Sequence, residues 1–298
     1  MIFTVTFNPA IDYVMQVGDV EFGITNRSKT EEIHFGGKGI NVSQVLSKLG
    51  EDTTALGFTA GFTGEALEKA VNKKGITADF IRLKKGNTRI NVKLKGEDET
   101  EINAAGPHIE EDELNCLFKK LSALKSGDTL VLAGSIPASL PNDIYEQIAK
   151  LIQNKGVRLV VDATGDLLLK VLKYKPFLIK PNKQELEEIV GYEIKNDEQL
   201  ISAANILKQK GAENVLVSLG AKGAILLSED GKIYKQTAFK VDAVNTVGSG
   251  DSMIAGFLAG LKNGYEYALK LGAAAGAATA ASSGLATKER IEELINEY

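Results

Sequence analysis

Residues 128–162 read DTLVLAGSIPASLPNDIYEQIAKLIQNKGVRLVVD, and this segment indicates how the chain folds. Its two short apolar runs, 128–133 and 157–162, are typical of buried strands, and residues 142–155 between them have helical periodicity. A strand, a helix and a second strand in this order form a βαβ unit with parallel strands. The segment therefore predicts a parallel sheet that is buried on both faces.

The same alternation continues on both sides of this segment. Apolar runs at 177–180 and 215–219 predict further strands, and residues 182–190 and 198–210 predict the helices between them. Residues 1–7 alternate between apolar and polar types, as a strand does. The sequence therefore predicts an α/β fold around a central, mostly parallel sheet.

One segment interrupts the alternation of strands and helices. Residues 89–95 alternate strictly, residues 96–99 resemble a turn, and residues 100–103 resume the strand pattern. This pattern predicts an antiparallel hairpin with one polar face. A hairpin at this place suggests a small lid or an interface outside the main sheet. The alternative, an antiparallel edge of the main sheet, remains open.

Composition limits the classes of function. The chain has 298 residues, a net charge of −4 and a sequence pI of about 5.5, so it lacks the basic surface of a nucleic-acid-binding protein. Cys116 is the single cysteine, which excludes an internal disulfide and a cysteine metal cluster and fits a reducing cytoplasm. His34 and His108 lie far apart in sequence and are more typical of surface or lid residues than of metal ligands.

Two segments bear on membrane targeting. Residues 1–7 have neither the basic nor the apolar region of a signal peptide. The alanine-rich stretch 268–286 contains Lys270, Ser282 and Ser283, and it is too polar for a membrane span. We therefore expect a cytoplasmic protein without a membrane partner.

The sharpest local motif is NTVGSGD at residues 245–251, which is followed by a helical pattern. Its glycines are predicted to leave backbone N–H groups at a helix N-terminus open to an anion. Asp251 in the first turn is then placed to accept a proton from a hydroxyl that attacks a phosphoryl group. The alternative is that Asp251 is an ordinary first-turn residue after a glycine turn.

Three further motifs are weaker when each is taken alone. Residues 35–43, FGGKGINVS, also open a helix with glycines, but they match neither a Walker A loop nor a dinucleotide fingerprint. Residues 218–223, SLGAKG, follow a strand and suit either a ligand loop or a plain tight turn. Asn182 and Glu185 suit either a water-mediated Mg²⁺ site or a helix N-cap with a capping-box Glu.

The order and content of these motifs together resemble the ribokinase-like (PfkB) carbohydrate kinases. The resemblance covers essentially the whole chain and includes the opening residues 8–12, NPAID, and the inserted hairpin. Within that family the chain resembles the branch of 1-phosphofructokinases and tagatose-6-phosphate kinases. The resemblance implies a three-layer α/β/α domain over residues 1–298, with a small β lid formed by segments at about 11–35 and 87–106.

The resemblance also implies roles for individual residues in catalysis and in ATP binding. Asp251 resembles the catalytic base, and Gly248, Ser249 and Gly250 resemble the anion hole. Asn182 and Glu185 resemble the motif that organises Mg²⁺ through water. The residues that resemble the ATP-binding set are Lys180, Asn182, Ser218, Leu219, Gly220, Ala221, Lys222, Gly223 and Gly250.

The remaining roles concern the sugar. Asp12 and Asn41 resemble the groups that hold sugar hydroxyls, and Gly37 resembles the residue packed beneath the sugar. Lys38, Arg27 and Arg89 are candidates for the phosphate that the substrate already carries, because arginine forks suit that group.

The implied reaction is ATP- and Mg²⁺-dependent phosphorylation of D-fructose 1-phosphate to fructose 1,6-bisphosphate. Tagatose 6-phosphate or fructose 6-phosphate are alternative substrates, because sequence alone does not fix the geometry of the pocket. A non-catalytic sugar-phosphate-binding module is a rival of another class, but such a module needs neither Asp251 nor the Asn182 and Glu185 pair. Relatives use such lids as an interface, so the resemblance also implies a homodimer formed through the lid.

Overall fold

The computed structural model describes residues 1–18 and 20–297. In these residues ten strands form a central sheet in the order β14-β13-β12-β11-β10-β9-β1-β4-β5, with β6 beside β4. The strands are β1 (Ile2–Thr6), β4 (Thr53–Ala60), β5 (Thr77–Ala78), β6 (Ile81–Leu83), β9 (Thr129–Ala133), β10 (Arg158–Asp162), β11 (Leu178–Ile179), β12 (Asn214–Ser218), β13 (Ala224–Leu227) and β14 (Ile233–Gln236). The pairs from β12 to β5 are parallel, and β13 and β14 add an antiparallel edge.

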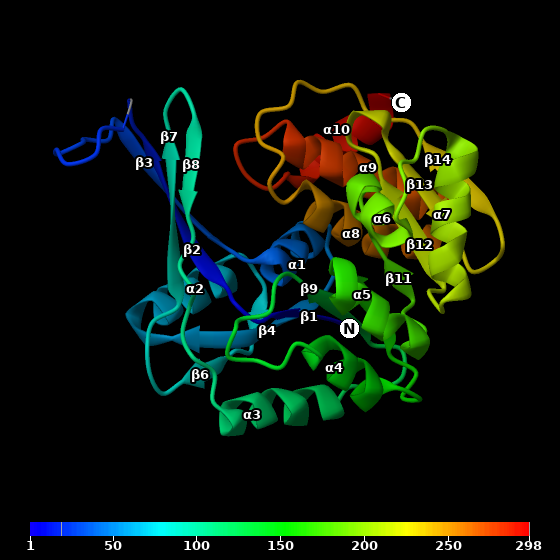
Figure 1. Ribbon diagram of the computed structural model, residues 1–298, viewed down its shortest axis with the longest axis horizontal. Coiled ribbons are helices and arrows are strands. Elements are labelled where there is room, and N and C mark those ends of the chain that lie inside the picture. Colours follow the sequence, from blue (N-terminus) through cyan, green and yellow to red (C-terminus); the bar gives the residue numbers. More distant parts are fainter. Residues whose placement is uncertain (19, 298) are drawn as a thin grey trace.

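Helices cover both faces of this sheet (Figure 1). Leu130 and Leu132 of β9 belong to one apolar core, and Val131 and Ala133 belong to the other. The first core is covered by α3 (Glu111–Ser122), α4 (Ile144–Ile152), α5 (Gly165–Val171), α6 (Lys183–Val190) and α7 (Asp197–Gln209). The second is covered by α1 (Lys38–Lys48), α8 (Ser249–Gly260), α9 (Tyr265–Ala280) and α10 (Lys288–Glu297), with α2 (Gly61–Lys73) packed beside α1.

The α/β architecture and each of the predicted strands and helices are confirmed. The strand predicted at 177–180 is shorter than expected, since β11 has two residues. The strand predicted at 1–7 is more deeply buried than its alternation suggests, because β1 lies in the middle of the sheet. Its Thr4 and Thr6 are fully or nearly buried, and their hydroxyls bond to Ser43 and to the backbone N–H of Ile40 in α1.

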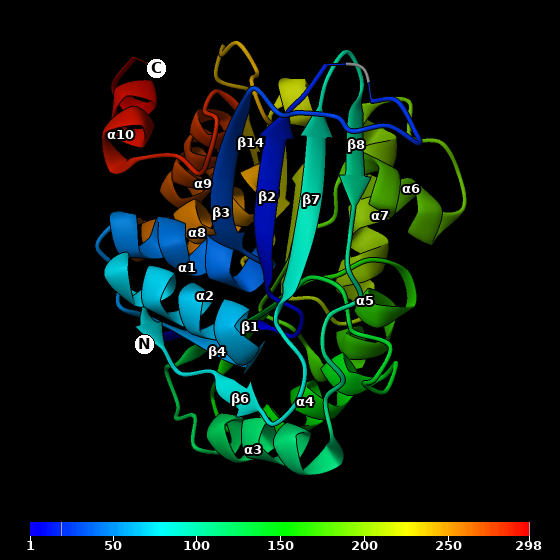
Figure 2. The ribbon, with the colours of Figure 1, turned by 90° about the vertical axis from the view of Figure 1, so that its left-hand side faces the viewer.

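A second sheet of four strands, which we call the small sheet, stands beside the layered body (Figures 1 and 2). Its strands are β2 (Ala10–Gln16), β3 (Thr30–Gly36), β7 (Arg89–Lys95) and β8 (Glu99–Ile102), in the order β3-β2-β7-β8. The predicted hairpin is confirmed, because β7 pairs antiparallel with β8. The alternative that this hairpin forms an edge of the main sheet is wrong, because β7 pairs on its other side with β2.

The two faces of the small sheet differ in polarity, since side chains along a strand alternate between its faces. One face carries Asp12, Asn91 and Lys93, which line a cleft. The opposite face carries apolar side chains, among them Ile33 and Ile102 with exposed fractions of 54% and 59%.

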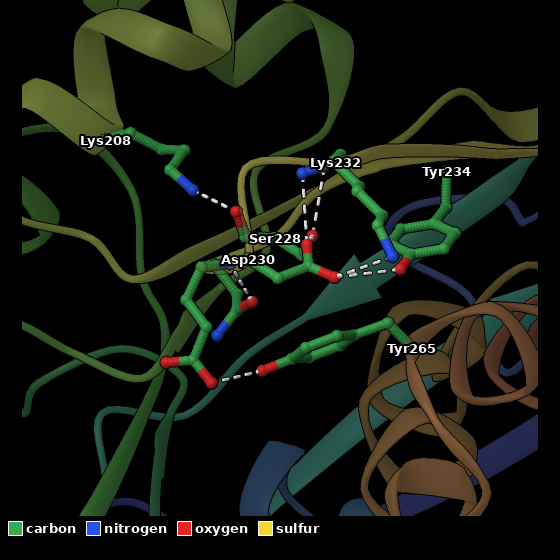
Figure 3. Close-up of polar contacts among 8 residues, drawn as sticks. Lys208, Ser228, Asp230, Lys232, Tyr234 and Tyr265 are labelled. Carbon is green, nitrogen blue, oxygen red and sulfur yellow. Dashed lines mark hydrogen bonds and ion pairs between the residues drawn. The ribbon is translucent and has the colours of Figure 1, made fainter.

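The turn between β13 and β14 lies at the other end of β12 from the cleft and is pinned by a polar network (Figure 3). Asp230 accepts hydrogen bonds from the hydroxyls of Ser228 and Tyr234. Tyr265, the first residue of α9, donates its hydroxyl hydrogen to Glu229 Oε1 at 2.6 Å. This network ties α9 to the edge of the sheet, and α9 in turn packs against α8.

Every helix in residues 1–18 and 20–297 is too short or too polar to pass through a lipid bilayer.

Candidate active site

The carboxyl ends of the parallel strands meet at one edge of the central sheet, where ligands of open α/β sheets bind. A cleft of about 1040 Å³ lies between this edge, the N-termini of α1 and α8, and the polar face of the small sheet. Most of the predicted site residues line it: Asp12, Gly37, Lys38, Asn41, Arg89, Lys180, Asn182, Glu185, Ser218, Gly248, Gly250 and Asp251. Sequence motifs up to 239 residues apart (12 to 251) are thus brought to one cavity.

Asp251 lies at the bottom of this cleft in the first turn of α8. The helix begins after Gly248, whose φ of 81° is a conformation that favours glycine. Asp251 has an exposed fraction of 4%, and its Oδ2 accepts a hydrogen bond from Asn41 Nδ2 at 2.9 Å. The carboxylate is therefore fixed in place at a helix N-terminus, where backbone N–H groups favour negative charge.

Asn41 reaches Asp251 because α1 packs closely on β1. Its N-cap, Gly37, has a φ of 134°, and a Cβ atom there would lie 2.5 Å from Thr6 Cγ2. A side chain at this position would push the start of α1 away from the sheet. Gly37 therefore serves the packing that brings the first turn of α1 against the first turn of α8.

A second carboxylate, Asp162 at the end of β10, joins two lysines. Its Oδ2 lies 3.2 Å from Lys38 Nζ, and its Oδ1 lies 3.2 Å from Lys180 Nζ. Lys180 also approaches α8, since a Cβ atom on Gly250 would lie 2.9 Å from its Nζ. Gly250 therefore leaves room for an ammonium group beside the helix N-terminus.

The pKa values of the two carboxylates, Asp251 and Asp162, are shifted in opposite directions. Burial raises the pKa of Asp251 to about 7, and the charge of Asp162 adds to this, while the Asn41 hydrogen bond and the two lysines oppose it. Burial also acts to raise the pKa of Asp162, but Lys180 and Lys38 outweigh it and lower that pKa. The site thus holds one ionised carboxylate paired with two cations, and one carboxylate that exchanges its proton near neutral pH.

Asn182 and Glu185 form a complete capping box at the start of α6. Asn182 Oδ1 accepts from the Glu185 N–H, and Glu185 Oε2 accepts from the Asn182 N–H, both at 2.8 Å. The N-cap alternative is therefore correct as local structure. Both residues also line the cleft, and Glu185 Oε1 is not used by the cap. Among the described residues, no group of three or more histidine, cysteine or acidic side chains is suited to hold a metal directly.

The loop predicted for nucleotide phosphates follows β12 as a short 3₁₀ turn, Gly220–Lys222. Ser218 lines the cleft, but Leu219 to Gly223 are not among its lining residues. Gly223 has a clear packing reason, because its φ is 98° and a Cβ atom would lie 2.0 Å from the Gln236 carbonyl oxygen in β14. The tight-turn alternative thus accounts for Gly223, and a role in phosphate binding stays a prediction.

The small sheet contributes the candidate substrate residues. Arg89 is half-buried, and its Nε and Nη1 donate to the carbonyl oxygens of Asn8 at 3.2 Å and Ala104 at 3.4 Å. Burial lowers the pKa of Arg89, and the charge of Asp12 partly restores it. Arg27 is exposed in the β2–β3 loop and does not line the cleft. Ser249 also lies outside the lining, and its buried Oγ has no hydrogen-bond partner in the described residues.

A comparison with protein families matches residues 5–291 to the pfkB family carbohydrate kinases. The chain belongs to this PfkB family. It is 44% identical to the 1-phosphofructokinase of Bacillus subtilis (strain 168), over all of this chain and 98% of that protein. It is 36% identical to the tagatose-6-phosphate kinase of Staphylococcus epidermidis (strain ATCC 35984), over 88% of this chain and 85% of that protein.

Solved structures agree with this PfkB assignment. Phosphofructokinase-2 from Escherichia coli, in complex with substrates and products, superposes with a TM-score of 0.91 at 27% identity, covering 99% of this chain and 98% of that one. Arabidopsis thaliana ribokinase shares the fold, with a TM-score of 0.80 at 23% identity over 99% of this chain and 98% of that one. The ribokinase-like fold expected from the sequence is confirmed.

Sequence reasoning about this PfkB kinase missed Asp162 and Asn91. Asp162 ends a predicted strand, so the rule that ligands bind at carboxyl strand ends was sufficient to find it. Asn91 is the third residue of the first strand of the predicted hairpin, on the polar side of the alternation. Its partner, Asp12, lies on a strand 79 residues earlier, and only the parallel pairing of β2 with β7 joins them.

Proposed function

We propose that this protein is a 1-phosphofructokinase, which transfers the γ-phosphoryl group of MgATP to the C6 hydroxyl of D-fructose 1-phosphate. The observation that carries the proposal is Asp251, buried at the N-terminus of α8 in the cleft with a pKa raised to about 7 by burial. A carboxylate of this kind suits a general base at neutral pH. The substrate assignment is supported by the 44% identity to a 1-phosphofructokinase along the whole chain.

In the proposed mechanism, Asp251 accepts the proton of the sugar hydroxyl as its oxygen attacks the γ-phosphorus. The leaving group is the β-phosphate oxygen, so the products are ADP and fructose 1,6-bisphosphate. Asn41 holds the carboxylate through Oδ2 during this step. The small sheet acts as a lid that closes over the sugar and excludes water, which limits hydrolysis of ATP.

Charge on the transferring phosphoryl group is met by two sources in this chain. The backbone N–H groups of Gly248 and Gly250 at the start of α8 would donate to the phosphoryl oxygens, whereas the Ser249 N–H already donates to the carbonyl oxygen of Thr246 at 3.2 Å. Lys180, held by Asp162 at 3.2 Å, adds an ammonium group beside that helix end. Asp162 offsets part of the charge of Lys180 when no phosphate is bound, so this buried lysine remains paired.

The residues at the end of β11 fit bound MgATP. Glu185 keeps one carboxylate oxygen free of the capping box, and Mg²⁺ in kinases is commonly held by one or two carboxylates, substrate phosphates and waters. Glu185, and Asn182 through water, would hold the ion, and Ser218 to Gly223 would contact the nucleotide phosphates. Mg²⁺, when bound, neutralises phosphate charge during the transfer.

The sugar is proposed to lie between α1 and the polar face of the small sheet. Asp12 and Asn41 would hold its hydroxyls above Gly37, and Arg89 with Lys38 would contact its existing phosphate. Two of the five N–H donors of Arg89 are used by carbonyl groups, which leaves three for a phosphate. Arg27 is the weakest candidate for this role, because its loop lies outside the cleft.

The substrate assignment is tested with the purified protein, MgATP and four ketohexose phosphates: fructose 1-phosphate, fructose 6-phosphate, tagatose 1-phosphate and tagatose 6-phosphate. We expect the highest kcat/KM, measured as ADP release, for fructose 1-phosphate. A higher kcat/KM for tagatose 6-phosphate would favour the alternative that the related tagatose-6-phosphate kinase suggests. Binding of sugar phosphates without any ADP release would favour a non-catalytic binding module.

We further propose a homodimer formed through the apolar face of the small sheet, the face opposite the cleft. Its exposed apolar residues include Ile33, Ile90 and Ile102, at 54%, 40% and 59%. An apolar surface formed by adjacent strands is typical of a protein interface. The lone cysteine, Cys116, is exposed, and we propose that the dimer works in the reducing cytoplasm.

We expect light scattering to give the mass of a dimer for the wild-type protein and of a monomer for Ile102→Lys, because a lysine would be buried without a partner in the interface. The control is Ile233→Lys, since Ile233 is 44% exposed on the edge strand β14, away from the small sheet. A wild-type monomer at micromolar concentration, or equal effects of the two substitutions, would refute the proposed interface.

A further inference from the structure

Asn91 is a buried polar residue in the middle of the small sheet. It lies in β7 with an exposed fraction of 7%, directly opposite Asp12 of β2 in the register of the two parallel strands. Its Nδ2 donates a hydrogen bond to Asp12 Oδ1 at 2.8 Å. Its Oδ1 is also buried but has no hydrogen-bond partner among the described residues.

An unpaired buried oxygen makes Asn91 costly to the fold. A buried acceptor that has lost its water without gaining a donor destabilises the folded state. Leucine has a similar shape, suits a strand, and would carry no such cost. Asparagine makes one hydrogen bond here that leucine could not make, from Nδ2 to Asp12. The presence of asparagine in spite of its cost therefore points to a role for this bond other than stability.

That bond constrains how Asp12 meets a ligand. Asn91 occupies Oδ1 of the carboxylate, and no described residue donates a hydrogen bond to Oδ2. The carboxylate thus has one tethered oxygen and one oxygen without a protein donor, and both residues line the cleft that holds Asp251. A tethered carboxylate loses less side-chain freedom on binding than a free one, which improves affinity.

We propose that Asn91 is a positioning residue for the sugar: it fixes Asp12 so that Oδ2 accepts a hydrogen bond from a substrate hydroxyl. This inference rests on the proposed function. It assigns to Asn91 a part in substrate binding that it performs only through Asp12. Asn91 acts on KM for the sugar phosphate, and it leaves the binding of ATP and the proton transfer at Asp251 unchanged.

The test is a double-mutant cycle of Asn91→Leu and Asp12→Asn, with kinetics on the sugar phosphate and thermal unfolding of each variant. We expect Asn91→Leu to lower kcat/KM for fructose 1-phosphate by about 10-fold, the size expected for one charge-assisted hydrogen bond. Its Tm should equal or exceed that of the wild type, since the unpaired oxygen is gone. In the Asp12→Asn background the same substitution should have little further effect.

Two results would overturn the inference. Losses that add fully in the double variant would mean that Asn91 does not act through Asp12. A lower Tm with kcat/KM within about twofold of wild type would mean that its role is structural. If Asn91→Leu does not fold, Asn91→Thr, which suits a strand, takes its place in the cycle. Wild-type protein that releases no ADP with any sugar phosphate would instead refute the proposed function, so the two failures are distinguishable.

Discussion

Asp251→Asn is expected to lower kcat by about 10²- to 10⁴-fold, the range that general base catalysis contributes. The asparagine keeps the size of the side chain and an oxygen that can accept from Asn41 Nδ2, but it cannot take a proton. KM for ATP should change little, because the lost interaction exists only when the hydroxyl is deprotonated in the transition state. The measurement is steady-state kinetics of both proteins with ATP and fructose 1-phosphate.

The pH profile is the second part of this expected result. Because burial raises the pKa of Asp251 to about 7, and a base acts only when it is ionised, wild-type kcat/KM should rise with pH through about 7. The residual activity of Asp251→Asn should lack this rise. Asp52→Asn, which removes an exposed carboxylate outside the cleft, should retain it. An Asp251→Asn turnover within about threefold of the wild type would contradict the assignment of the base.

The raised pKa also predicts that the ionised form of Asp251, which catalysis needs, makes the folded state less stable. The folded state binds the Asp251 proton more tightly than the unfolded state does, so the neutral form stabilises the fold at low pH. This contribution is lost as pH rises through about 7. Asp251→Asn should therefore raise Tm more at pH 8 than at pH 5, and the same preparations can be used to measure it.

Arg89→Ala is expected to lower kcat/KM for fructose 1-phosphate by roughly 10- to 150-fold, the effect of losing a charge-assisted contact of ~1.5–3 kcal/mol. A sugar phosphate carries close to two negative charges near neutral pH, and the guanidinium in the cleft is the group best shaped to meet them. KM for ATP should be unaffected. The loss for unphosphorylated fructose should be much smaller, since fructose offers the guanidinium no partner.

A matched control for this prediction is Arg82→Ala. Arg82 is exposed and paired with Glu68 at 2.7 Å, away from the cleft, so its removal should leave both sugars unaffected. Equal losses for fructose 1-phosphate and fructose in Arg89→Ala would mean that Arg89 shapes the base of the small sheet through its bonds to Asn8 and Ala104. In that case it would not recognise the phosphate.

The features that the sequence predicts well are local ones. The start of α8 and the position of Asp251 follow from a glycine turn directly before a helical pattern, and the capping box of Asn182 and Glu185 follows from a spacing of three. The hairpin follows from strict alternation on either side of a turn. In each case, the residues that determine the structure are neighbours in the chain.

The features that it predicts poorly depend on distant contacts. Lys38 and Asp162 are 124 residues apart, and Asn91 and Asp12 are 79 apart, so no local pattern joins them. The depth of β1 depends on its neighbours in the sheet, and its threonines are buried because α1 packs over them. The close contact of Gly223 with β14 is likewise not predicted by the local sequence, while its role in the phosphate loop stays a prediction.

The most direct test of the proposed activity is the identity of the product. Wild-type protein is incubated with MgATP and fructose 1-phosphate, and the mixture is followed by phosphorus NMR. The proposal predicts that ATP is converted to ADP while a second phosphomonoester signal appears, matching authentic fructose 1,6-bisphosphate, and that Asp251→Asn forms this product far more slowly. Unchanged ATP and fructose 1-phosphate in the wild-type reaction, alongside turnover of a 6-phosphate sugar, would contradict it.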